Sequence, residues 1–133
     1  MLSVSSSQAD QLSLGHLFRH TKWTLLEAGS CSDALHLIRS FPVPVVICDS
    51  TLPDGEWRDL LDQAVLSTSV PPLLIVASRL ADDRLWAEVM DAGGYDVLEK
   101  PFNHSEVVRV VSLAWLQWKN QLRAGKRRTA GEY

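Results

Sequence analysis

The stretch Val45-Val46-Ile47-Cys48-Asp49-Ser50-Thr51-Leu52-Pro53 decides the fold. Its first four residues are apolar without interruption and rich in β-branched side chains, which predicts a strand that is covered on both faces, as in parallel sheets. The run ends in a carboxylate, Asp49, and a proline-containing loop follows. Because ligands of parallel α/β sheets bind outside the carboxyl ends of the strands, we expect Asp49 at a functional edge.

A later segment has a matching pattern with the opposite charge. The short apolar run 95–98 precedes Glu99-Lys100-Pro101-Phe102, so Lys100 is expected at the same edge of the sheet as Asp49. A carboxylate can act as a nucleophile, and a nearby ammonium group can neutralise an incoming phosphoryl group. The two segments therefore predict a phosphoryl-acceptor site.

Strand and helix patterns alternate five times along the 133 residues. Strands are predicted at 2–4, 23–26, 45–48, 73–76 and 95–98. Helices follow after Ser7, after Ser32, after Gly55, from Leu85 to the stop at Gly93-Gly94, and after Asn103. Strict alternation in a chain of this length predicts an open parallel sheet with helices on both faces. We expect a flavodoxin-like, doubly wound (βα)5 α/β fold with strand order 2-1-3-4-5.

Charge divides the chain into an acidic body and a basic end. Residues 1–122 carry 9 Lys and Arg against 15 Asp and Glu, a net charge of −6, while residues 123–133 have a net charge of +3. We expect one domain over 1–122 and a flexible basic tail over 123–133, with no output domain after it. An acidic body argues against nucleic-acid binding, which depends on many cations.

The remaining composition predicts a soluble, cytoplasmic protein. No apolar run is long enough for a membrane span, and Cys31 and Cys48 occur without a secretory leader, which favours reduced thiols. Cys48 is expected to be a small buried residue rather than a reactive thiol. The four histidines lack the spacing of metal ligands.

Taken together, these segments resemble the receiver domain of two-component response regulators. The resemblance covers residues 1 to about 118 and rests on Asp49-Ser50-Thr51-Leu52-Pro53, on Ala92-Gly93-Gly94 with the strand after it, and on Lys100-Pro101-Phe102. It implies that Asp49 is the phosphoacceptor and that Lys100 contacts the phosphoryl group. It also implies that Asp49 and the Thr51 carbonyl bind Mg²⁺ and that the Lys100-Pro101 bond is cis.

The chain departs from the family where receivers hold Mg²⁺ with an acidic pair after the first strand. Ser5 and Ser6 occupy those positions. Hydroxyls do not replace two charges for a hard cation that dehydrates reluctantly, so we expect Mg²⁺ binding to be weak or absent. Asp10 and Asp54 are the carboxylates that could compensate in part, although Asp10 is expected in the first helical turn.

Two more departures concern the switch between signalling states. The hydroxyl that receivers place at the end of the fourth strand falls on Ala77, with Ser78 one residue later, and the switch aromatic of the fifth strand falls on Val97. Because one step along a strand turns a side chain to the other face, Ser78 is expected to contact the phosphoryl group only if the strand ends at Val76.

Three of the five tryptophans are candidates for an interface. Trp86 lies on the fourth predicted helix, and Trp115 and Trp118 lie on the last. Packing in the core is the alternative for all three. If they are exposed, they mark the face that receivers use for dimers and downstream partners, and Trp is frequent among binding hot spots.

The residues leave two functions open. In the first, Asp49 accepts a phosphoryl group from a histidine kinase or phosphotransfer protein, and the domain signals through protein contacts, including a homodimer. In the second, the chain is a pseudo-receiver, an interaction module that works without phosphorylation because Ser5 and Ser6 replace the acidic pair. Neither function is enzymatic beyond self-phosphorylation, and a nucleotide-binding enzyme lacks support because no Gly-rich phosphate loop is present.

Overall fold

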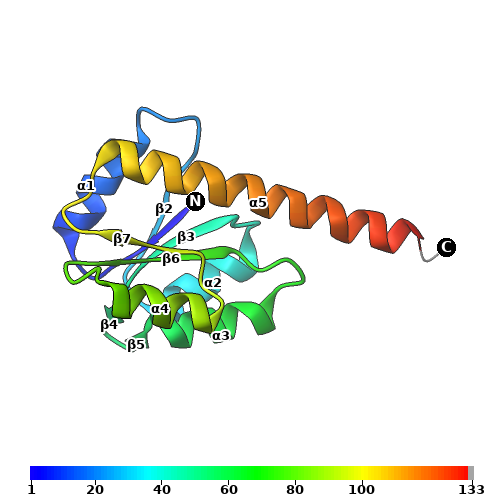
Figure 1. Ribbon diagram of the computed structural model, residues 1–133, viewed down its shortest axis with the longest axis horizontal. Helices are drawn as coiled ribbons and strands as arrows, with labels where there is room; N and C mark the ends of the chain where they lie inside the picture. The colour runs from blue at the N-terminus through cyan, green and yellow to red at the C-terminus, as the bar shows by residue number, and fades with distance from the viewer. Residues whose placement is uncertain (132–133) are drawn as a thin grey trace.

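The computed structural model describes the backbone of residues 1–131 and the side chains of residues 1–125. A five-stranded parallel sheet with the order β2-β1-β3-β6-β7 forms the centre of the protein (Figure 1). The strands are β1 (Leu2–Val4), β2 (Leu26–Ala28), β3 (Val45–Asp49), β6 (Leu73–Ser78) and β7 (Asp96–Glu99). In this sheet the order is 2-1-3-4-5, so the predicted flavodoxin-like topology is confirmed.

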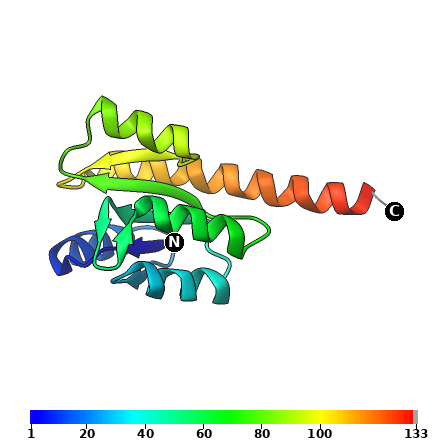
Figure 2. The same ribbon diagram turned by 90° about the horizontal axis from the view of Figure 1, so that it is seen from below.

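Helices cover both faces of the sheet (Figures 1 and 2). They are α1 (Gln8–Phe18), α2 (Cys31–Ser40), α3 (Trp57–Ser67), α4 (Asp83–Ala92) and α5 (His104–Gly131). One buried cluster joins the sheet to α2, α3 and α4, and the other joins it to α1 and α5. The predicted two-sided packing is therefore present.

The central strand β3 shows why a continuous apolar run was the strongest signal. Val46 and Cys48 belong to the cluster under α2 and α3, whereas Val45 and Ile47 belong to the cluster under α1 and α5. All four side chains are at most 2% exposed. Side chains alternate between the faces of a strand, so a strand covered on both faces must be apolar at every position.

Polar side chains begin most of the helices at or near the predicted residues. Ser7 accepts a hydrogen bond from the backbone N–H of Asp10 at 3.3 Å, and Asn103 accepts one from Glu106 at 3.0 Å. The predicted cap at Ser32 is wrong: Ser30 caps α2, accepting from the N–H of Asp33. Ser32 is already inside the helix.

The second strand begins later than predicted. The sequence favoured residues 23–26, but β2 pairs with β1 only from Leu26 to Ala28. Trp23 belongs instead to a turn in which the Thr21 hydroxyl accepts a hydrogen bond from the Trp23 N–H at 3.2 Å. The Trp23 ring packs against Trp115 of α5, so its apolar character serves helix packing rather than the sheet.

The other strand ends also shift at the functional edge. β3 includes Asp49, β6 continues through Ala77 to Ser78, and β7 begins at Asp96 and ends at Glu99. The expected end of the fourth strand at Val76 is therefore wrong. A short antiparallel pair, β4 (Thr51–Leu52) and β5 (Gly55–Glu56), follows Asp49 and was not predicted.

The last helix extends beyond the sheet that it covers. α5 extends through residues 123–131, which the sequence analysis assigned to the tail, and projects beyond the sheet (Figures 1 and 2). Residues 132 and 133 of that predicted tail lie outside the described residues. Among the described residues no helix combines the length and the apolar character that a membrane span needs.

Candidate functional site

The carboxyl edge of the sheet brings Asp49 and Lys100 together. Asp49 is the last residue of β3, and Lys100 follows β7 directly. The Lys100 Nζ lies 2.7 Å from Asp49 Oδ1, and the two side chains are 11% and 14% exposed. The Lys100-Pro101 peptide bond is cis, as expected. A carboxylate and a cation thus share one small, largely buried site.

A second carboxylate, Asp10 of α1, completes the site. The Lys100 Nζ lies 2.6 Å from Asp10 Oδ2, and the Asp10 side chain is 17% exposed. The Lys100 ammonium group therefore bridges two carboxylates that come from different elements. The sequence analysis named Asp10 only as a compensating metal ligand and did not predict its contact with Lys100.

Ser5 holds the other oxygen of Asp49. Its hydroxyl donates a hydrogen bond to Asp49 Oδ2 at 2.6 Å and accepts one from the Ser7 N–H at 3.0 Å. Ser5 is 5% exposed, whereas Ser6 is exposed to solvent. Both oxygens of Asp49 are thus engaged, Oδ1 by an ammonium group and Oδ2 by a hydroxyl group.

The charges of the site favour the ionised form of Lys100. Burial alone would lower the pKa of this lysine because it disfavours the ammonium form. The hydrogen bonds and negative charges of Asp10 and Asp49 outweigh that effect and raise the pKa above its usual value. Lys100 is therefore a fixed cation at neutral pH.

The residues at this edge do not fit Mg²⁺. Ser5 and Ser6 replace the acidic pair, and Asp10 is bound to Lys100. Asp54 is directed elsewhere, since its carboxylate accepts the backbone N–H groups of Cys31 and Ser32 at the start of α2. Among the residues whose side chains are described, no group of three or more His, Cys, Asp or Glu is arranged to hold a metal ion.

The loop after Asp49 is held from two sides. Thr51 pairs with Glu56 in the β4–β5 hairpin, and Glu56 and Asp59 form a reciprocal capping box at the start of α3. The two hydrogen bonds from α2 to Asp54 measure 2.8 and 3.0 Å and lower the pKa of this carboxyl group. The loop that carries the Thr51 carbonyl is therefore tied to α2 and α3.

The structure places the remaining predicted residues around this edge. Ala77 is the parallel partner of Asp49 across β3 and β6, and Ser78 is still in the strand, one step further. The Ser78 hydroxyl accepts the Leu80 N–H at 3.1 Å. Val97 is half-buried and packs against the cluster under α2 and α3. Neither member of a hydroxyl and aromatic switch pair is present at Ala77 and Val97.

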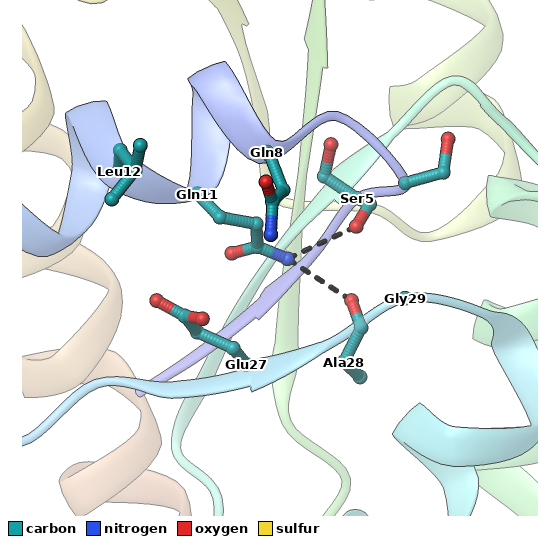
Figure 3. A pocket seen from close by; sticks show the side chains of 8 residues that line it. Ser5, Gln8, Gln11, Leu12, Glu27, Ala28 and Gly29 are labelled. Atoms are coloured by element: carbon teal, nitrogen blue, oxygen red, sulfur yellow. Dashed lines mark hydrogen bonds between the residues drawn. The ribbon is translucent and has the colours of Figure 1, made fainter.

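A polar pocket of about 500 Å³ lies next to Ser5, between α1 and the end of β2 (Figure 3). Gln11 reaches from α1 across it, and its Nε2 donates to the carbonyls of Ser5 and Ala28 at 3.1 Å each. This amide ties the ends of β1 and β2 together. It therefore helps to position Ser5 beside Asp49.

The tryptophans that were candidates for an interface separate into two groups. Trp86 on α4 is 50% exposed, and its neighbour Met90 is 40% exposed. Trp115 and Trp118 are half-buried: Trp115 packs on Trp23, and Trp118 lines a cavity at the opposite edge of the sheet from Asp49. Only Trp86 of the three offers half of its surface to solvent.

Fold and edge chemistry together define a class of doubly wound α/β proteins with a carboxylate and lysine site at the carboxyl ends of the strands. A family model described as the response regulator receiver domain matches residues 2–112. The chain belongs to this family. It is a receiver domain of two-component signal transduction, a family whose members partner with histidine kinases and are typically non-enzymatic phosphoacceptors.

One curated relative is a probable transcriptional regulatory protein, TcrX, from Mycobacterium tuberculosis (strain ATCC 25618 / H37Rv). It is 34% identical over 91 residues, a match that covers 68% of this chain and 38% of the relative. The chain thus matches well under half of the length of that protein.

Solved structures with the same fold include receiver domains of several proteins. The signal receiver domain of an HD domain-containing protein from Pseudomonas fluorescens Pf-5 superposes with a TM-score of 0.82 at 24% identity, covering 92% of this chain and 90% of the other. That of a putative Luxo repressor protein from Vibrio parahaemolyticus gives 0.83 at 22% identity, covering 92% and 94%. The beryllofluoride-activated NtrC4 receiver domain dimer gives 0.79 at 20% identity, covering 88% and 96%.

Proposed function

We propose that this receiver accepts a phosphoryl group on Asp49 and passes the signal on through protein contacts. The observation that carries the proposal is the 2.7 Å contact between Asp49 Oδ1 and Lys100 Nζ at the carboxyl edge of the sheet. Membership of the receiver family supports it, because receivers are typically phosphoacceptors.

The proposed reaction uses groups that are already in place. A carboxylate oxygen of Asp49 attacks the phosphorus of a phosphohistidine, a P–O bond forms, and the P–N bond breaks. The electron pair of the broken bond stays on the imidazole nitrogen of the donor, which takes up a proton from solvent. Lys100 neutralises charge on the phosphoryl oxygens, and the Ser5 hydroxyl can donate to one of them. Ser78 is not included as a donor, because β6 continues through Ser78 and its hydroxyl accepts the Leu80 N–H.

A second candidate function is the pseudo-receiver, and a specific observation favours it. Both oxygens of Asp49 are engaged by Ser5 and Lys100, and Lys100 is also bound to Asp10, in a site where the donor set does not fit Mg²⁺. In this alternative the ion pairs are structural, and the domain docks its partner in one state. Cys31 and Cys48 are free thiols, which agrees with a cytoplasmic place for either function.

Incubation with acetyl phosphate separates the two candidates, because this donor needs no partner protein. We expect an adduct of one phosphoryl group by intact mass, which Asp49→Asn abolishes and Asp54→Asn, the matched control in the same loop, leaves in place. Beryllofluoride, added with and without Mg²⁺, should shift the amide signals around Asp49. A domain that gives neither adduct nor shift is a pseudo-receiver.

We further propose that the signal leaves through the face formed by α4, β7 and the adjoining side of α5. Trp86 and Met90 of α4 and Leu113 of α5 are large apolar side chains that are 40–50% exposed. A homodimer or a downstream protein partner would cover them. Dimers occur among proteins of this fold, as in the activated NtrC4 receiver.

A further inference from the structure

A second cavity has a volume of about 540 Å³, and neither Asp49 nor its partners Ser5, Asp10 and Lys100 line it. One wall is the turn after α1, with His20, Lys22 and Trp23, and the other is the outer side of α5, with His104 and Trp115. The turn arches over α5 (Figure 1), and the Trp23 and Trp115 rings meet at 6.1 Å. Neither the acceptor site nor the α4–β7–α5 face uses these residues.

The turn that forms the first wall is held by its own hydrogen bonds and ring contacts. Thr21 donates its backbone N–H and its hydroxyl to the Phe18 carbonyl, at 3.0 and 2.7 Å, and the hydroxyl also accepts the Trp23 N–H. The Trp23 ring is held between Phe18, at 6.4 Å, and Trp115. A ligand would therefore meet a preformed cavity and would not have to order its wall.

The charge of the cavity is opposite to that of the domain. Its lining holds Lys22, His20 and His104 and no Asp or Glu, in a body that carries a net charge of −6 over residues 1–122. A fourth basic side chain is adjacent, because Lys119 Nζ lies 4.4 Å from the centre of the Trp115 ring. An imidazole donates at least one N–H in either protonation state, so all of these groups offer donors to an anion.

We propose that this cavity, which we call the tryptophan pocket, binds a planar aromatic molecule that carries a carboxylate or phosphate group. The ring would contact Trp23, Trp115 and Val108, and the anion would accept hydrogen bonds from Lys22 and the two histidines. Aromatic surface with a few polar groups is the usual composition of small-molecule sites, and the cavity volume lies within their usual range. The site would tie the turn after α1 to α5, the helix that projects from the domain.

The test uses indole-3-acetate as the probe, followed by the indole N–H signals of the five tryptophans in a ¹⁵N-correlated NMR spectrum. We expect saturable, submillimolar shifts of the Trp23 and Trp115 signals, with those of Trp57 and Trp86 unchanged. AMP is the second probe, because it carries phosphate in place of carboxylate and so distinguishes the two sources of the anion. Neutral indole and inorganic phosphate are the controls, and each should bind more weakly than either probe.

The double variant Lys22→Ala/His104→Ala removes donors at exposed positions and should weaken binding about tenfold. Arg84→Gln, on α4 across the sheet, is the matched control for charge and should bind as the unchanged protein does. Circular dichroism checks that all variants fold. Equal binding of neutral indole, equal binding by the double variant, or no shift of Trp23 and Trp115 with either probe would overturn the proposal.

Discussion

The Ser5 hydroxyl donates a hydrogen bond to Asp49 Oδ2 at 2.6 Å. Receiver domains usually carry an acidic residue at the position of Ser5. The substitution changes the sign of the interaction. A carboxylate at this position would repel Asp49 unless a cation lay between them, whereas the hydroxyl satisfies Asp49 directly. The site can therefore exist with Lys100 as its cation.

This geometry predicts the response to Mg²⁺. The unchanged protein should show no saturable binding at submillimolar Mg²⁺, and its melting temperature should be the same in Mg²⁺ and in EDTA. The double variant Ser5→Asp/Ser6→Asp should lose stability in EDTA, because carboxylates would crowd Asp49, and regain it when Mg²⁺ binds. Thermal unfolding in both buffers measures the difference. Saturable submillimolar binding by the unchanged protein would show that Asp10, Asp54 or another group supplies the missing ligands.

Asp10 provides a test of the second ion pair. Asp10→Asn leaves Lys100 with one carboxylate, and we expect a loss of about 1.5–3 kcal/mol in the free energy of unfolding, as for a hydrogen bond between charged groups with little exposure. Urea denaturation measures it.

Asp33→Asn is the matched control for Asp10. Asp33 also lies in the first turn of a helix with its N–H bonded to a serine cap, but it is exposed. Its loss should reflect only the helix dipole, about 0.3–1 kcal/mol. Equal losses for the two variants would contradict a special role of Asp10.

The raised pKa of Lys100 predicts an alkaline limit to stability. A group whose pKa is higher in the folded than in the unfolded protein stabilises fully below the unfolded value, here 10.5, and loses that contribution as the pH rises through the folded value. The unfolding free energy should therefore fall above about pH 10.5, and the fall should be smaller in Lys100→Met. The difference between the two urea-unfolding profiles isolates Lys100 from the tyrosines, which both proteins retain. Parallel profiles would refute the assignment.

The sequence predicted those parts of the fold that depend on a local, repeated pattern of apolar residues. The apolar run before Asp49 has no polar position, which indicates a strand covered on both faces and therefore a central one. The apolar run before Lys100 likewise indicates a strand, and this places Lys100 at the carboxyl edge of the sheet. The role of Asp10 was missed because its partner is 90 residues away, and nothing in a first helical turn reveals that contact. Trp23 was assigned to a strand because an apolar side chain does not show whether a sheet or a helix will cover it. The β4–β5 hairpin has only two-residue strands, too short for a periodic signal.

Asp54 links the loop after Asp49 to α2 and should protect the first amides of that helix from hydrogen exchange. Asp54→Asn removes the negative charge that Cys31 and Ser32 bind, so hydrogen exchange at these two amides should accelerate, while amides at the start of α4, capped by Asp82, should not change. In the unchanged protein, acid should lower the protection of these two amides, measured as their exchange relative to the intrinsic rate at each pH. The pKa of Asp54 is lowered from 3.8, so its contribution is present above that value and is lost as the pH falls through the folded pKa. Unchanged exchange in the variant would mean that Ser30 alone fixes the start of α2.

Trp86 offers the sharpest test of the α4–β7–α5 face as an interface. Because half of its surface is exposed beside Met90, Trp86→Ala should weaken association in sedimentation experiments and leave the circular dichroism spectrum intact. Leu66→Ala on α3 removes an equally apolar, 81% exposed side chain outside this face and should leave association unchanged.

Trp118→Ala should reduce stability rather than association. Its ring lines a cavity with Phe41, Val70 and Pro72, so we expect a loss of about 1–3 kcal/mol in stability, as for a half-buried aromatic residue. If Trp86→Ala unfolds the domain, or if Leu66→Ala weakens association as much, the apolar surface of α4 is not the interface.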